Sequence, residues 1–225
     1  MEVWSKEINH PYLKVQAEDV VSPGYGATRA DDSLYVENRR FSTTLYFILA
    51  GVFLLVACIF LTLEEHAILV FSVASIPAVF CLLYGIYGPA KQLTYDRLND
   101  TITLSRPLFL KHKVLKFSTG YAVKAYYSAT EGIIDSSLLF VPDKRKLSFG
   151  GKITDTDQKE YWHFTVWYMD KNRPLPPGTA FDQHRQKDYE RRKAEGFPKP
   201  LYPSAIPTPE ATRAQQRERE RIGGW

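Results

Sequence analysis

Residues 61–69, LTLEEHAIL, place two glutamates and a histidine between two long apolar runs. The run before them, LYFILAGVFLLVACIFLTL (45–63), and the run after them, AILVFSVASIPAVFCLLYGIYG (67–88), contain no charged residue. As α-helices the two runs would be about 28 and 33 Å long, close to the thickness of a hydrocarbon core. The pattern predicts a transmembrane helical hairpin with residues 64–66 at its solvated tip.

The basic residues predict the orientation of this hairpin. Arg39 and Arg40 precede the first run, Lys91 and Arg97 follow the second, and the tip contains no Lys or Arg. By the positive-inside rule both termini are expected in the cytoplasm. The sequence therefore predicts a two-pass protein of the cell inner membrane, with the lipid bilayer as one partner.

Two other interpretations of the apolar block remain open. One is a buried pair of helices in a soluble core, with Glu64 and Glu65 in a surface loop. The other makes one of these glutamates a proton or ion site, since acidic residues inside a membrane usually have a function. Ala74 and Ala78 form a small-xxx-small pair and are a candidate contact between the helices.

After Lys91 the hydrophobic pattern alternates, as in strands. KQLTYDRLNDTITLSR (91–106) predicts a hairpin that turns at Asn99 and Asp100. In EYWHFTVWYM (160–169), a strand would bury Trp162 and leave His163 facing solvent. Further strands are predicted at 113–118, 121–128, 136–141 and 146–151, and a charged helix at 180–196.

These elements predict an α+β membrane protein. Its hairpin is followed by a cytoplasmic, mostly antiparallel β domain of about six or seven strands, closed by a C-terminal helix. YLKVQ (12–16) is a candidate strand that joins this sheet, and the tail has no apolar face, so we expect it to be disordered or ordered by a partner. The expected divisions are an N-terminal cytoplasmic segment (1–44), the hairpin (45–88), the β domain (91–196) and a Pro/Arg-rich tail (197–225).

The element order, and the pattern TYDRLNDTITL (94–104) after the second apolar run, resemble bacterial two-pass membrane proteins with a pleckstrin-homology-like domain. The resemblance covers about residues 45–195. It implies a binding or assembly role at the membrane rather than catalysis.

The sequence contains no recognisable catalytic constellation. GxSxG, HExxH and CxxC motifs are absent, and the histidines are not spaced as metal ligands. We therefore predict no catalytic, cofactor or metal site, and a protein that is not an enzyme. In the basic tail, positive residues alternate with glutamate, as in RERER, which does not favour nucleic-acid binding.

Basic residues also gather after the second apolar run, where they form a candidate patch for anionic lipid headgroups. The alternative is the ordinary positive-inside bias together with lysines that protect strand edges. The candidate residues are Lys91, Arg97, Arg106, Lys111, Lys113 and Lys116.

The function predicted from these features is a subunit or regulator of a membrane-associated complex. It would act through its β domain and tail, by protein partners or self-association. An autonomous membrane protein of the exclusion, immunity or defence-effector kind is the alternative, and a channel-forming oligomer is a third.

Overall fold

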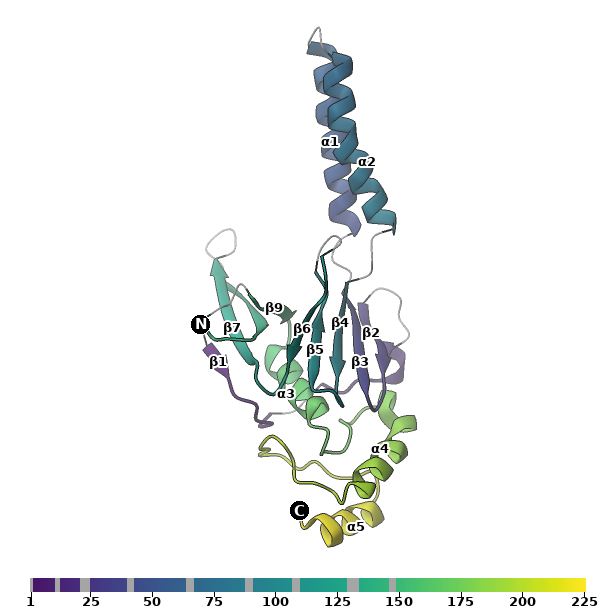
Figure 1. The fold of residues 1–225 in the computed structure, drawn as a ribbon, viewed down its shortest axis with the longest axis vertical. Helices are drawn as coiled ribbons and strands as arrows, with labels where there is room; N and C mark the ends of the chain where they lie inside the picture. Colours follow the sequence, from purple (N-terminus) through teal and green to yellow (C-terminus); the bar gives the residue numbers. More distant parts are fainter. Residues whose placement is uncertain are drawn as a thin grey trace. The chain divides into compact units, whose positions relative to one another are not determined.

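The chain, as a computed structural model, is described over residues 2–10, 13–20, 25–39, 43–63, 67–87, 91–106, 110–128, 134–145 and 149–225 (Figure 1). It forms two compact units. The first comprises Met1–Asn38, Gln92–Ser105 and His112–Trp225, and the second comprises Arg39–Lys91 and Arg106–Lys111.

The first unit contains a sheet of four strands in the order β1-β7-β8-β9. All three pairings are antiparallel, and β1 lies along the first half of β7, with Val3 opposite Val123. The predicted strand 121–128 is confirmed, while residues 146–148 of another predicted strand lie outside the described residues. The strands are β1 (Glu2–Trp4), β7 (Tyr121–Ser128), β8 (Ile134–Val141) and β9 (Gly151–Thr154).

A second sheet has five strands in the order β2-β3-β4-β5-β6. The predicted hairpin at 91–106 is confirmed, since β4 pairs antiparallel with β5 and Leu93 faces Leu104. Its turn places Asp100 at φ 57°, and the Asn99 backbone N–H donates to Asp96. The strands are β2 (Tyr25–Ala30), β3 (Leu34–Arg39), β4 (Lys91–Asp96), β5 (Thr101–Leu104) and β6 (Lys113–Lys116).

Helix α3 (Gln158–Met169) occupies the segment predicted as a strand, so that prediction is wrong. Every side chain from Tyr161 to Met169 is buried, and a segment buried on all sides carries no helical period. Its aromatic and β-branched residues favour a strand locally, but packing overrides this preference. Trp162 contacts Phe140 of β8, and Phe164 contacts Tyr35 of β3, so α3 packs against both sheets.

Residues 179–223 contain three helical elements and are not an unstructured tail. The predicted helix at 180–196 is present as η4 (Thr179–Phe181) and α4 (Asp182–Ala194). Helix α5 (Arg213–Gly223) follows, and Thr212 and Gln215 close a reciprocal capping box at its start. Residues 213–223, expected to be disordered or ordered by a partner, form a helix in the structure.

Helices α1 (Thr43–Leu63) and α2 (Ala67–Tyr87) form the second unit and pack on each other. The Tyr46 and Tyr84 ring centroids lie 4.8 Å apart, and Ala50 and Ala78 are buried. Apolar side chains are exposed along both helices, among them Ile48, Val52, Leu55, Ile76, Val79, Leu83 and Ile86. The predicted tip, residues 64–66, lies outside the described residues.

Within the described residues, neither these helices nor any other is long and apolar enough to cross a membrane. This finding overturns the prediction of a two-pass inner-membrane protein with both termini in the cytoplasm.

The predicted fold class, a membrane hairpin followed by one β domain, is also wrong. The described residues form an α+β fold with two sheets, of four and five strands, and five α-helices. The difference arises because the N-terminal segment supplies β1 to one sheet and β2 and β3 to the other. Residues 13–16, the described part of the candidate strand YLKVQ, form no strand.

Gly178 allows a close approach between the N-terminal segment and η4. Its φ is +134°, and a Cβ there would lie 2.1 Å from the Val15 carbonyl oxygen. We expect Gly178→Ala to lower the free energy of unfolding by more than about 2 kcal/mol, because strain and a backbone clash add. Gly196→Ala is the control, with φ +77° but open space, and should cost about 1 kcal/mol. Urea unfolding measures both, and equal losses would contradict this explanation.

Candidate functional site

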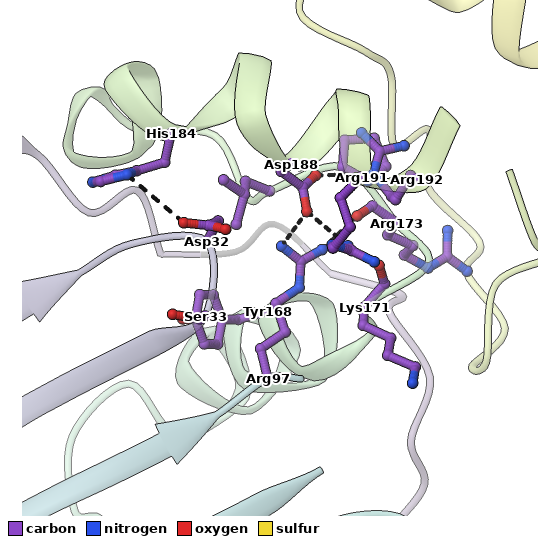
Figure 2. Close-up of polar contacts among 12 residues, drawn as sticks. Asp32, Ser33, Arg97, Tyr168, Lys171, Arg173, His184, Asp188, Arg191 and Arg192 are labelled. Carbon is purple, nitrogen blue, oxygen red and sulfur yellow. Dashed lines mark hydrogen bonds and ion pairs between the residues drawn. The ribbon is translucent and has the colours of Figure 1, made fainter. Parts of the chain in front are cut away.

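A cluster of buried charges joins β4 to helix α4. Asp188 of α4 accepts from Arg97 Nη1, Arg191 Nη2 and Arg192 Nε, each at 2.9 Å (Figure 2). Arg97 has no solvent exposure, and Asp188 is 1% exposed. Arg97 Nη2 also donates to the carbonyl oxygens of Asp170 and Arg173. The arginine thus binds the C-cap residue of α3 and the turn that follows it.

The cluster extends to the C-terminal segment through two more carboxylates. Glu210 accepts two hydrogen bonds from Arg192, at 2.7 and 2.8 Å, and a third from Arg219. Asp170 accepts from Arg173 Nε at 3.0 Å and from the backbone N–H of Leu201. Paired forks of this kind fix orientation as well as charge.

The electrostatics of this cluster do not provide a general base. Burial alone raises the pKa of Asp188, but Arg97, Arg192 and Arg191 outweigh it and hold that pKa below its usual range. The carboxylate therefore stays ionised, with both oxygens occupied by arginines. The cluster is suited to joining β4, α3, α4 and the C-terminal segment, and not to moving protons.

A cleft of about 270 Å³ lies elsewhere in the first unit, beside β1. The indoles of Trp4 and Trp162 line it, and Trp162 Nε1 donates to the Ser5 carbonyl at 2.7 Å. It is close to the lower limit of small-ligand pockets in size. The lining residues are Glu2, Val3, Trp4, Ser5, Asn9, His10, Lys159, Trp162 and His163.

Two histidines stack at this cleft. The rings of His10 and His163 lie 5.3 Å apart between centroids, at 18° to each other. His163 is 6% exposed, and its Nδ1 has no hydrogen-bond partner within the described residues. Burial, and then the nearby His10 and Lys159, lower the pKa of His163 to about 4, so the ring is neutral near pH 7.

The wall of the cleft is attached to the C-terminal segment. Ile8 forms a parallel bridge with Ser204, its N–H donates to the Pro203 carbonyl, and its own carbonyl accepts from Ala205. Lys6 donates to the carbonyl of Ser118 and lies 4.9 Å from the Phe117 ring centroid. Residues 5–10 are thus held between the β structure and residues 203–205.

The predicted lipid-patch residues differ in burial and in the unit to which they belong. Arg97 is fully buried in the ion cluster, so its guanidinium does not face solvent. Lys116, Lys111 and Arg106 are exposed, Lys113 is half-buried, and the side chain of Lys91 is outside the described set. Arg97, Lys113 and Lys116 belong to the first unit, and the other three to the second. Lipid binding by the exposed members stays a prediction.

The other sequence predictions have mixed outcomes at the residue level. Ala78 is buried in α2, whereas the side chain of Ala74 is outside the described set. His163 was predicted to face solvent and is buried, because its segment is a helix. Among the described residues, no group of three or more His, Cys, Asp or Glu side chains is placed to hold a metal ion. Motif searches miss the cleft because its residues come from two distant segments.

Asp188 provides a test of the ion cluster. We expect Asp188→Asn to lower the free energy of unfolding by about 3–5 kcal/mol, because it leaves buried guanidinium charges without a counter-charge. Asp182→Asn is the control on the same helix, since Asp182 pairs with Arg185 but is 63% exposed, and should cost less than about 1 kcal/mol. Denaturant unfolding compares them, and similar losses would exclude a special role for the buried cluster.

The pH dependence of the free energy of unfolding tests the lowered pKa of His163. Because its pKa falls from 6.5 in the unfolded chain to about 4 in the fold, the unfolded state takes up the proton first as pH decreases. The stability from the neutral ring is complete above about pH 6.5 and is lost as pH falls toward 4, by an amount on the order of 1–3 kcal/mol. His163→Gln should flatten this part of the stability curve, and exposed His112→Gln should leave it unchanged. If stability depends on pH in His163→Gln as it does in the wild type, the lowered pKa of His163 is contradicted.

Comparison with known proteins assigns no family to this chain. No protein-family model, curated protein or solved structure matches it.

Proposed function

We propose that this chain is a binding and assembly protein, a subunit or regulator of a larger complex, and that a protein partner contacts it at the cleft beside β1. The observation that carries this proposal is the cleft itself, in which the half-buried Trp4 and the exposed Val3 meet a polar rim and the buried Trp162 forms the floor. Aromatic side chains surrounded by polar groups are the usual composition of energetic centres in protein interfaces.

A binding role rather than catalysis is supported by the state of the titratable groups. The carboxylates of Asp188 and Glu210 are occupied by arginines. His163 has a pKa of about 4, which keeps it neutral near pH 7 and makes it a weak base there. Asp188, Glu210 and His163 are therefore suited to stabilising the fold.

The C-terminal segment has an indirect part in this proposal. Residues 203–205 hold Ile8, and Glu210 fixes the same segment to Arg192 of α4. Loss of the segment would release the wall of the cleft and also leave Arg192 with one buried counter-charge fewer. A truncation after about residue 197 would therefore disturb both stability and binding, so point changes in the cleft are the cleaner test.

Site-specific photo-crosslinking in cells tests the proposed surface. A photoreactive amino acid at Val3, which is 39% exposed, should produce a discrete adduct with a partner protein, identified by mass spectrometry. The matched control is Val114 on β6, which is 59% exposed and should give no such adduct. Because the control is the more exposed position, exposure alone cannot produce the expected difference.

The same adduct from both positions, or an adduct from Val114 alone, would contradict the proposed surface. Crosslinks from Val3 only to a second copy of the chain would replace the heterologous partner by self-association. The free thiols Cys58 and Cys81 should be alkylated beforehand, so that disulfide-linked species are not mistaken for adducts.

A further inference from the structure

His10 and His163 join the two segments that form the cleft. His10 belongs to the wall made by residues 5–10, His163 belongs to α3, and their rings stack at 5.3 Å with 18° between the planes. His10 is exposed whereas His163 is 6% exposed, so the N-terminal wall lies over the imidazole of His163. Burial disfavours the charged form of an imidazole, so this stack favours a neutral His163.

A proton on His163 would meet positive charge from both segments. The charged or titratable side chains that line the cleft with it are Glu2, His10 and Lys159. After burial, His10 and Lys159 are the groups that lower the pKa of His163 to about 4, and no carboxylate is among the groups that shift it. The adjoining residues of the C-terminal segment, 203–205, carry no charge. Ionisation of His163 is therefore opposed by its neighbours as well as by burial.

His184 has the opposite surroundings. Its Nδ1 lies 3.9 Å from Oδ1 of Asp32, so a proton on this ring would be stabilised by a carboxylate. The position of His163 between two bases is thus a feature of the cleft and not of every histidine in the chain.

Residues 5–10 are the weaker of the two sides of the stack. They contain no helix or strand, and the backbone of Ile8 connects them to residues 203–205. Helix α3 is fixed by aromatic contacts with both sheets. Segments near a chain end with few backbone hydrogen bonds open at low free energy. Lys6 also holds this wall, and its pKa of about 8 keeps it mostly charged at pH 7 and below, so acid does not weaken its bond to Ser118.

We propose that the His10–His163 stack is an acid-sensitive switch of the cleft: when the rings take up protons, residues 5–10 move away from α3, the cleft opens and the partner dissociates. This inference rests on the proposed binding function and adds its regulation. The released wall contains Ser5, Asn9 and His10, which line the cleft. Histidine is suited to such a role because modest changes in its surroundings move its charge change across neutral and mildly acidic pH.

The size of the effect follows from proton linkage. His163 has a pKa of about 4 while the wall covers it, and a histidine in water has a pKa near 6.5. The open form therefore binds the proton more strongly, and acid favours it, beginning below about pH 6.5 and ending near pH 4. Between pH 7 and pH 5 the equilibrium constant for opening should rise about twentyfold.

Hydrogen exchange of the full chain at pH 7 and pH 5, corrected for the intrinsic pH dependence of exchange, measures this opening. The amide of Ile8, which donates to Pro203, should lose protection about twentyfold, while the amides of β8 keep theirs. The indole N–H of Trp162, bonded to Ser5 at 2.7 Å, should also lose protection. That of Trp167, bonded to Pro174 at 2.7 Å, is the matched control and should not. No loss at Ile8, or an equal loss in β8, would overturn the proposal.

Two variants identify the group that responds to pH. His163→Gln should remove the loss of protection, and exposed His112→Gln should leave it as in the wild type. His10→Glu changes an exposed position and places a carboxylate beside His163, so it should reduce the loss to less than about threefold. A wild-type loss in His163→Gln or in His10→Glu would show that the stack is not the switch.

The photo-crosslink at Val3 separates the switch from the proposed function. In permeabilised cells, the adduct yield at pH 5 relative to pH 7 should fall severalfold in the wild-type background and should not fall in the His163→Gln background. If no adduct forms at either pH, the proposed function is wrong, and hydrogen exchange still decides whether the switch exists. If the adduct persists at pH 5 although residues 5–10 open, regulation of the partner by this switch is wrong.

Discussion

The buried pair of Arg97 and Asp188 is the interaction on which the first unit most depends. Both side chains are removed from water, and removing two charges from water costs several kcal/mol for each ion unless every donor and acceptor finds a partner. Arg97 also donates to the carbonyls of Asp170 and Arg173, just after α3, while its Nε has no partner among the described residues. Asp188 also accepts from Arg191 and Arg192 of α4, and Arg192 in turn binds Glu210 of the C-terminal segment. The four elements must therefore assemble together, since any arrangement that separates them leaves a charge buried and uncompensated (Figure 2).

Helix α3 sits at the centre of this arrangement. The carbonyl of Asp170, the residue after its last turn, accepts from Arg97, while Trp162 and Phe164 contact different sheets. The same helix supplies Lys159, Trp162 and His163 to the cleft. A helix fixed at one end by an ion cluster, and along its length by aromatic contacts, gives the cleft a rigid side. Rigid pockets lose less entropy when they bind.

The other side of the cleft depends on contacts between the two ends of the chain. Residues 5–10 are held by Ile8 pairing with Ser204 and by Lys6 bonding to Ser118. The segment that holds Ile8 is itself attached to α4 through Glu210 and Arg192. The ion cluster and the cleft are therefore linked through the C-terminal segment, although their side chains do not touch the same atoms. A substitution in the ion cluster should therefore alter the cleft through the C-terminal segment.

Local features of the sequence determined the hairpin of β4 and β5, the strands β6, β7 and β8, the helix α4 and the helical form of the two apolar runs, because each has a clear period or turn. Tertiary structure alone decided several other features. α3 carries a strand-like composition that burial on all sides overrides, and β1 and β3 pair with strands far along the chain. The sequence pattern suggested an exposed Arg97. Its counter-charge, Asp188, lies 91 residues further along the chain, so only the folded structure shows that the two are buried together. The cleft is equally non-local, since residues 2–10 and 159–163 meet only after folding, and no local pattern encodes such a meeting.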